Sequence, residues 1–259
     1  MSTPTVLVHR DPGELAAAVA ARLLTRLVDV QSARGEASLV LTGGGMGRRV
    51  LEAVRDSPAR NAVDWRRLDV WWGDERFLPS GDPERNETLA REALLDHVPV
   101  DLARVHPMPA SDGADGADPE AAAARYADQL AIAARPEDHG PAPSFDVTLL
   151  GVGPDGHIAS LFPGMPALYD DRTVVAVRGA PKPPPTRLSL TVATIQGSHE
   201  VWAVVAGGDK AKAVTMALSG AGPTLVPAAA AAGRDRTLWL LDKPAAGTLP
   251  ARLSRIASP

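Results

Sequence analysis

The chain has 259 residues, 45% of them hydrophobic, which suits a globular protein with a full core. Its net charge of −4 argues against general attraction to nucleic acids or membrane surfaces. The absence of cysteine excludes disulfides and thiolate metal sites, and no apolar run resembles a signal peptide or a membrane span. We therefore expect a soluble, cytoplasmic protein whose partners include neither nucleic acid nor membrane.

Predicted strands and helices alternate along the chain. The strands are expected at residues 5–9, 38–42, 68–72, 145–150, 173–177, 187–191, 200–206 and 237–241. The helices are expected after an N-cap motif at 11–14 and at 48–55, 86–97, 118–134 and 210–218. Residues 73–85 are expected to form a polar loop, and residues 110–118 an exposed one. This order predicts a single α/β domain over residues 1–259, with a largely parallel, Rossmann-like sheet and helices on both faces.

An acid and an imidazole follow the strand predicted at 145–150. Asp155 and His157 lie two residues apart in the glycine-rich sequence GVGPDGHIASLFPG. Ligands of open α/β sheets bind where strands end, and the ordinary imidazole pKa of about 6.5 suits proton transfer near neutral pH. The pair therefore predicts acid–base chemistry at this loop.

The same glycines also fit a dinucleotide-binding motif. Gly151, Gly153 and Gly156 match G-x-G-x-x-G, but that motif needs a helix that opens at its third glycine. Pro163 and Pro166 leave room for only a turn or two. A catalytic loop is therefore preferred over nucleotide binding.

A second glycine-rich segment, residues 43–47, lies between a predicted strand and a predicted helix. Exposed N–H groups at such a turn, here those of Gly43, Gly44 and Gly45, favour an anion such as phosphate. The segment lacks the Lys-Ser/Thr ending of a P-loop. The alternative is a tight turn that binds nothing.

Charged residues follow two more predicted strands. After 68–72, Arg76 could bind a phosphate or carbonyl oxygen while Asp74 orients a substrate hydroxyl, although a surface ion network is the simpler interpretation. After 200–206, Lys210 opens a helix, where a cation is unfavourable unless an anion lies nearby, although a solvated lysine is equally expected. Arg187, at the start of a strand, is a further candidate. The histidines other than His157 show no metal-ligand spacing, so no metal site is expected.

These segments together, in this order, resemble the 6-phosphogluconolactonase family, within the larger group that includes glucosamine-6-phosphate deaminases. The resemblance runs nearly end to end. Besides the glycine turn, it rests on WWGDERF at 71–77, LLGVGPDGHIASLFPG at 149–164, KPPPTRLSLT at 182–191 and VAGGDKAKAV at 205–214.

The resemblance implies hydrolysis of 6-phospho-D-glucono-1,5-lactone to 6-phosphogluconate, in the oxidative pentose phosphate pathway, without a cofactor. It implies that His157 is the general base and that Asp155 and Asp74 are acidic residues of the same pocket. The groups implied to contact the phosphate or the oxyanion are Arg76, Arg187, Lys210 and the amides of Gly43, Gly44 and Gly45. The partner would be the sugar-phosphate lactone, and we expect a monomer or a weak homo-oligomer.

Two alternatives remain at this point. The deaminases carry a glutamate five residues after the histidine, where this chain has Phe162, which cannot transfer a proton. A non-catalytic sugar-phosphate sensor would be favoured by loss of Asp155 or His157, and both are present. One departure from the family pattern affects the site: Met46 and Gly47 stand where relatives often have a hydroxyl residue and Thr-Pro. A hydroxyl contact to the phosphate therefore cannot be inferred there.

Overall fold

A seven-stranded sheet, in which every neighbouring pair is parallel, runs through the computed structural model, which describes residues 2–250, 253 and 255–256. Its strand order is β10-β1-β9-β8-β5-β2-β3. The strands are β1 (Pro4–His9), β2 (Ala37–Leu41), β3 (Leu68–Trp72), β5 (Val147–Leu150), β8 (Glu200–Val205), β9 (Arg236–Asp242) and β10 (Arg255–Ile256). The predicted α/β fold with a largely parallel sheet is confirmed.

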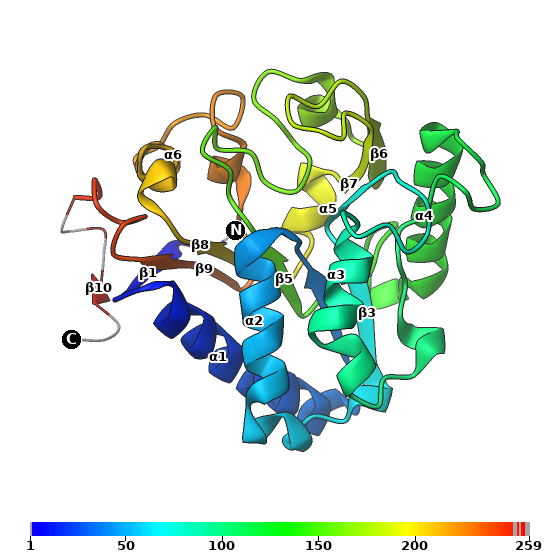
Figure 1. The fold of residues 1–259 in the computed structure, drawn as a ribbon, viewed down its shortest axis with the longest axis horizontal. Coiled ribbons are helices and arrows are strands. Elements are labelled where there is room, and N and C mark those ends of the chain that lie inside the picture. Colours follow the sequence, from blue (N-terminus) through cyan, green and yellow to red (C-terminus); the bar gives the residue numbers. More distant parts are fainter. Residues whose placement is uncertain (1, 251–252, 254, 257–259) are drawn as a thin grey trace.

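Helices pack around this sheet (Figure 1). They are α1 (Pro12–Arg34), α2 (Gly44–Asp56), α3 (Asn86–Ala93), α4 (Pro119–Ala133), α5 (Val192–Gln196) and α6 (Ala211–Leu218). Helix α2 lies between α1 and α3, whereas α4 packs against strands outside the main sheet. Short 3₁₀ helices cover Pro58–Ala62, Trp65–Arg67, Leu95–His97, Leu102–Arg104, Pro136–Asp138, Pro166–Tyr169, Gly208–Lys210 and Pro227–Ala230. Among the described residues, no helix is both long and apolar enough to cross a membrane.

The local sequence explains where α1 begins and ends. The Asp11 carboxylate accepts a hydrogen bond from the Glu14 amide at 2.9 Å, and Pro12 occupies the first turn, where no amide partner is needed. Gly35 ends the helix with a φ of 82°, a left-handed conformation that glycine adopts without steric cost. The predicted N-cap motif is thus present.

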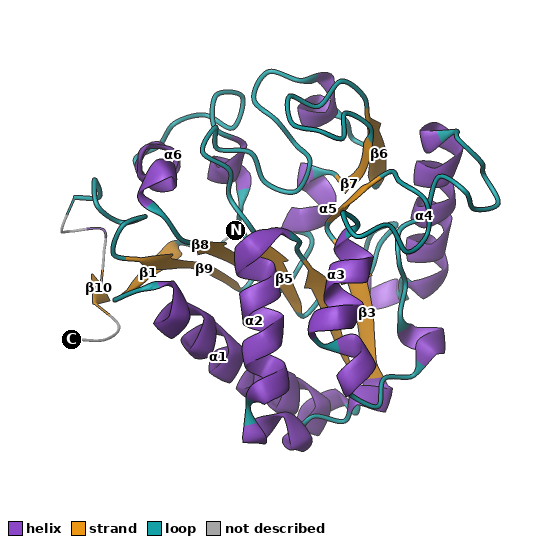
Figure 2. Ribbon diagram, in the orientation of Figure 1, coloured by secondary structure: helices purple, strands orange, loops and turns teal. Residues whose placement is uncertain are grey.

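A second sheet, not predicted from the sequence, stands apart from the first (Figure 2). It is antiparallel, with the order β4-β7-β6, where β4 is Asp74–Arg76, β6 is Val174–Val177 and β7 is Arg187–Leu190. The expectation of a loop throughout 73–85 was therefore wrong. Three polar residues carry no strand pattern of their own, and β4 exists because it pairs with β7.

Helix boundaries also differ from the prediction. The helix expected at 48–55 is α2, which spans Gly44–Asp56, so its first turn includes glycines of the predicted turn. The helix expected at 86–97 ends at Ala93, because Leu94 has a non-helical backbone (φ −147°, ψ −52°), and Leu94 and Leu95 are both buried there. The helix expected to open at Lys210 begins at Ala211 instead, and Lys210 closes a preceding 3₁₀ turn.

The core lies on the faces of the main sheet. Strand β8 is buried along its whole length, as expected for a central parallel strand covered on both faces. Four tryptophans fill much of the interior: Trp71, Trp72, Trp202 and Trp239. Since all strands of this sheet are parallel, the loops after β2, β5, β8 and β9 emerge at one edge, where α/β proteins bind ligands.

Candidate active site

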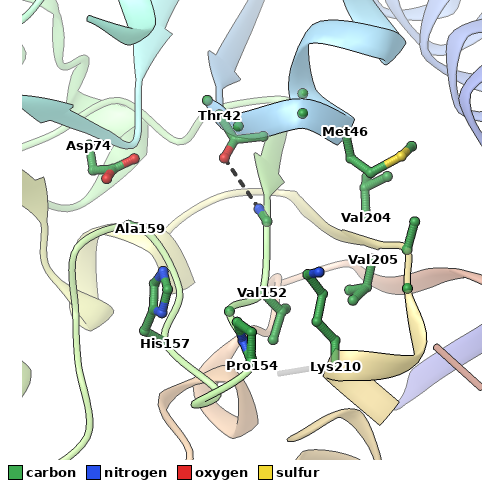
Figure 3. A pocket seen from close by; sticks show the side chains of 18 of the residues that line it. Thr42, Met46, Asp74, Val152, Pro154, His157, Ala159, Val204, Val205 and Lys210 are labelled. Atoms are coloured by element: carbon green, nitrogen blue, oxygen red, sulfur yellow. Dashed lines mark hydrogen bonds between the residues drawn. The ribbon is translucent and has the colours of Figure 1, made fainter. Parts of the chain in front are cut away.

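A pocket of about 500 Å³ opens at this edge of the sheet. Its lining includes all but one of the residues predicted for the site: Gly43, Gly44, Gly45, Asp74, Arg76, His157, Arg187 and Lys210. The exception is Asp155, which does not line the pocket and contacts His157 instead. Figure 3 shows Asp74 and His157 on one side of the pocket and Lys210 on the other.

His157 is oriented by Asp155. The two side chains approach to 2.5 Å, between the imidazole Nδ1 and the carboxylate Oδ1. Since a carboxylate can only accept, Nδ1 is the protonated nitrogen of the neutral ring, which leaves Nε2 as an acceptor. Burial raises the pKa of Asp155, but the hydrogen bond from His157 and the charges of His157 and Lys182 outweigh it and lower that pKa to about 2. Asp155 therefore stays ionised at neutral pH.

Close packing holds the imidazole ring in place. The Phe162 ring lies 4.5 Å from the His157 ring, centroid to centroid. A Cβ atom on Gly153 would lie 2.1 Å from the His157 ring, so only glycine fits there. The Gly153 amide also donates to the His157 carbonyl at 3.0 Å. The glycine that seemed to belong to a nucleotide motif therefore makes room for the histidine.

Asp74 is a buried carboxylate held on both oxygens. The Ser160 hydroxyl donates to Oδ2 at 2.7 Å, and the Asn86 amide lies 3.3 Å from Oδ1. Ser160 comes from the loop that carries His157, and Asn86 from the start of α3. Two distant segments thus set the orientation of Asp74 at the pocket wall.

Arg76 and Arg187 lie side by side on paired strands, because they are partners in the register of β4 and β7. Arg76 Nη1 donates to the Glu84 carbonyl at 2.7 Å and to Asn86 Oδ1 at 2.9 Å, while its buried Nε has no partner. Arg187 is 5% exposed and donates to the carbonyls of residues 182, 183 and 184. Burial lowers the pKa of Arg187 below its ordinary value, and the charge of Asp74 opposes that shift.

Lys210 reaches the pocket from the other side. Its ammonium contacts the Asp209 carboxylate at 2.9 and 3.0 Å. The turn that carries Lys210 is anchored from below, because the buried Asp242 carboxylate accepts from the Gly207 amide at 3.1 Å and from the Ala245 amide at 2.7 Å. A cation just before a helix is electrostatically unfavourable, and the Asp209 carboxylate offsets part of that unfavourable energy. A bound anion would contact the same ammonium group as Asp209.

The glycine turn after β2 forms the first residues of α2. Gly43 is the N-cap and supplies no side-chain hydrogen bond to the helix amides, so these remain available to an anion. Nothing lies within 4 Å of the Cβ positions of Gly44 and Gly45, consistent with a turn that faces open space. Met46 lines the same wall, and the nearby Thr42 hydroxyl accepts from the Gly151 amide at 3.2 Å (Figure 3).

The pocket lining also includes two cations and one side-chain amide that were not predicted as site residues. Arg49 lies four residues after Gly45 and hence on the same face of α2, a spacing that could have indicated it. Lys182 precedes the prolines of the 182–191 motif, and its ammonium lies 3.9 Å from Asp155. The sequence does not indicate Asn86 as a site residue, because its place beside Asp74 and Arg76 depends on how α3 packs.

This arrangement suits hydrolysis of an anionic substrate. An oriented imidazole with a free acceptor nitrogen can take a proton from water. The cations of Arg49, Arg76, Lys182, Arg187 and Lys210 can bind a phosphate and stabilise negative charge that develops on an oxygen. The pocket therefore combines a general base with several groups that favour anions.

Comparison with known proteins identifies the family of this chain. Residues 10–239 match the family described as glucosamine-6-phosphate isomerases/6-phosphogluconolactonase. The chain is 61% identical to a 6-phosphogluconolactonase of Streptomyces coelicolor, over 99% of this chain and 98% of the relative. It is 49% identical to that of Mycobacterium tuberculosis, over 95% and 98% of the two chains.

Solved structures give the same result. The structure of 6-phosphogluconolactonase from Trypanosoma brucei superposes with a TM-score of 0.82 at 29% identity, covering 96% of this chain and all of the other. The match to the family extends over the glycine turn, the Asp155–His157 loop and the Lys210 turn. The chain therefore belongs to the glucosamine-6-phosphate isomerase/6-phosphogluconolactonase family.

Proposed function

We propose that this chain is a 6-phosphogluconolactonase, which hydrolyses 6-phospho-D-glucono-1,5-lactone to 6-phospho-D-gluconate in the oxidative pentose phosphate pathway. The single observation that carries the mechanism is the His157–Asp155 pair at the wall of a pocket rich in cations. A relative that is 61% identical over 99% of this chain carries this name.

In the proposed reaction, Nε2 of His157 removes a proton from water as the water oxygen attacks the lactone carbonyl carbon. The carbonyl oxygen becomes an oxyanion. When it re-forms the carbonyl, the ring carbon–oxygen bond breaks, and the released alkoxide takes the proton from His157. Asp155 stabilises the imidazolium that forms in between. Water is the only co-reactant, and the proposed steps use only groups of the protein.

The anion-binding groups have two tasks in this reaction. One set must bind the phosphate of the substrate, and at least one donor must stabilise the oxyanion. We assign these tasks jointly to Arg76, Arg187, Lys210 and the amides of Gly43, Gly44 and Gly45. Asp74, held by Ser160 and Asn86, is assigned to the orientation of a substrate hydroxyl.

The deaminase alternative is not favoured. Phe162 stands where deaminases have glutamate, is 1% exposed and packs on the His157 ring. A phenyl ring cannot carry the proton that ring opening of an aminosugar requires. The sensor alternative is not favoured either, since the acid–base pair is intact and oriented. We further propose that the chain acts as one domain in the cytoplasm, as a monomer or weak homo-oligomer, without nucleic acid.

The test is the rate of lactone opening, measured on 6-phosphogluconolactone generated in situ, with spontaneous hydrolysis subtracted. We expect rapid hydrolysis by the wild type and a kcat lower by roughly 10²- to 10⁴-fold in His157→Ala, the usual contribution of a positioned acid–base group. No acceleration by folded wild type would refute the lactonase assignment. An unchanged rate in His157→Ala would remove His157 from the mechanism.

A further inference from the structure

Asn86 connects three parts of the pocket that come from different elements. Its side-chain amide donates to the Asp74 carbonyl at 2.8 Å and lies 3.3 Å from Asp74 Oδ1. Its side-chain oxygen accepts from Arg76 Nη1 at 2.9 Å. Donor and acceptor are both used, so neither can be replaced without loss of a contact. One buried amide thus bridges the carboxylate and the guanidinium at the ends of β4.

The same side chain also touches the glycine turn. A Cβ atom on Gly43 would lie 1.8 Å from Asn86 Oδ1. Asn86 therefore fills the space that a side chain at position 43 would need, at a place where α2 packs against α3. Gly43, Asp74 and Arg76 thus all lie against this one residue.

The backbone of Asn86 is held by a carboxylate that the proposed mechanism does not use. Glu75 is 0% exposed, and its oxygens accept from the amides of Asn86 at 2.6 Å and Glu87 at 2.8 Å. These are the first two residues of α3, whose N-cap residue, Arg85, supplies no side-chain hydrogen bond of this kind. Glu75 therefore caps α3 from another element and fixes where the helix begins.

We propose that Asn86 is a positioning residue of this active site, which sets the distance and orientation between Asp74, Arg76 and the glycine turn, and that Glu75 acts through it. This inference rests on the proposed lactonase function. It explains why a buried carboxylate lies directly between two pocket residues in the sequence DER. Asp74 and Arg76 line the pocket, and Glu75 contacts the first residues of α3.

The first test is Asn86→Ala, in the full chain, assayed with 6-phosphogluconolactone. Alanine is well tolerated in the first turn of a helix, so the variant should fold. We expect kcat/KM to fall by about 10²-fold, the scale of a misplacement of about 1 Å, through both a higher KM and a lower kcat. A purely structural role would reduce the folded fraction, which lowers apparent kcat but leaves KM unchanged.

The second test asks whether Glu75 acts through Asn86. Glu75→Gln keeps the shape but places a donor group against backbone amides that also donate. If Glu75 acts through Asn86, the double variant should have the same kcat/KM as Asn86→Ala alone, since the loss is shared. If the two losses multiply, Glu75 acts independently of Asn86, and that part of the inference is overturned.

Asp118→Ala is the matched control. Asp118 caps α4 with bonds to the Glu120 and Ala121 amides at 3.0 and 3.4 Å, and it does not line the pocket. We expect this loss of a helix cap to lower stability without a change in KM or kcat. A folded Asn86→Ala with both constants within about twofold of an active wild type would overturn the inference, since a 1 Å misplacement costs far more. An inactive wild type would instead refute the proposed function itself.

Discussion

Asp155 determines which ring nitrogen of His157 is free to act as a base, because its carboxylate contacts Nδ1. Its pKa of about 2 keeps the carboxylate charged throughout the neutral range. A charged Asp155 in turn keeps the proton of neutral His157 on Nδ1 and directs the basic Nε2 away from the carboxylate. A base that needs no rearrangement before each turnover follows from two residues separated by a single glycine.

Lys210 and Arg187 differ in how cleanly they can test phosphate binding. Lys210→Ala removes a half-buried cation whose partner, Asp209, is its own neighbour, so the fold should tolerate the change. We expect KM to rise about 10- to 100-fold with kcat little changed, since a charge-assisted hydrogen bond contributes about 1.5–3 kcal/mol and is made equally in ground and transition states.

Lys243→Ala is the control for this prediction, because Lys243 is exposed and does not line the pocket. A fall in kcat alone for Lys210→Ala would contradict phosphate binding and place Lys210 at the reacting carbonyl. Arg187→Ala should raise KM too, but it also releases three carbonyls of residues 182–184, so its effect on stability must be measured beside the kinetics.

At the scale of single elements, a short polar strand cannot be predicted from the sequence pattern. Strand β4 has three residues, and its register places Arg76 opposite Arg187 and Asp74 opposite Ser189. Two guanidinium groups on paired positions repel each other, which is unfavourable unless an anion lies between or beside them. The charge of Asp74 offsets part of this repulsion at Arg187, and we expect a bound anion to offset it further.

Helix α3 should carry a pH dependence of stability through Glu75. Burial raises the pKa of Glu75 to about 7, although Arg85 and the amides of residues 76, 86 and 87 oppose the shift. The Glu75 carboxyl group therefore binds its proton more tightly in the folded state than in the unfolded chain. The resulting stabilisation is complete below the ordinary carboxyl pKa and is lost as pH rises through about 7.

We therefore expect the free energy of unfolding of the wild type to fall between pH 5 and pH 8 more steeply than that of Glu75→Gln, which cannot ionise. Urea titrations of both proteins at the two pH values measure the difference. A constant gap between them would show that Glu75 does not titrate in this range.

On the scale of the whole molecule, the residues of the core stabilise the fold, whereas the residues that we assign to the reaction belong to the pocket. Leu240, 0% exposed on β9, lies in the core and outside the pocket lining. We expect Leu240→Ala to lower the free energy of unfolding by about 2–5 kcal/mol, through lost burial and the cavity that remains. Below the unfolding transition its kcat and KM should match the wild type, as measured by denaturant titration and lactone assay. A changed KM would mean that the pocket depends on core packing at this strand.

Much of the fold and of the site could be predicted from the sequence. Alternating hydrophobic runs and turn residues placed most helices and strands, and strands that end in glycine, acid or cation indicated the sheet edge where Gly43, Asp155, His157 and Lys210 lie. These signals are local, because they depend on spacing within one element and the loop that follows it.

Only the tertiary structure decided the remaining contacts. Ser160 binds Asp74 across 86 positions of sequence, Asn86 meets Gly43 through the packing of α2 and α3, and β4 exists only through its pairing with β7. Each such contact joins two elements, and the sequence pattern of neither element indicates it. The sequence by itself determined which groups could do the chemistry, whereas their distances and orientations were decided by packing, because non-local contacts leave no periodic signal in the chain.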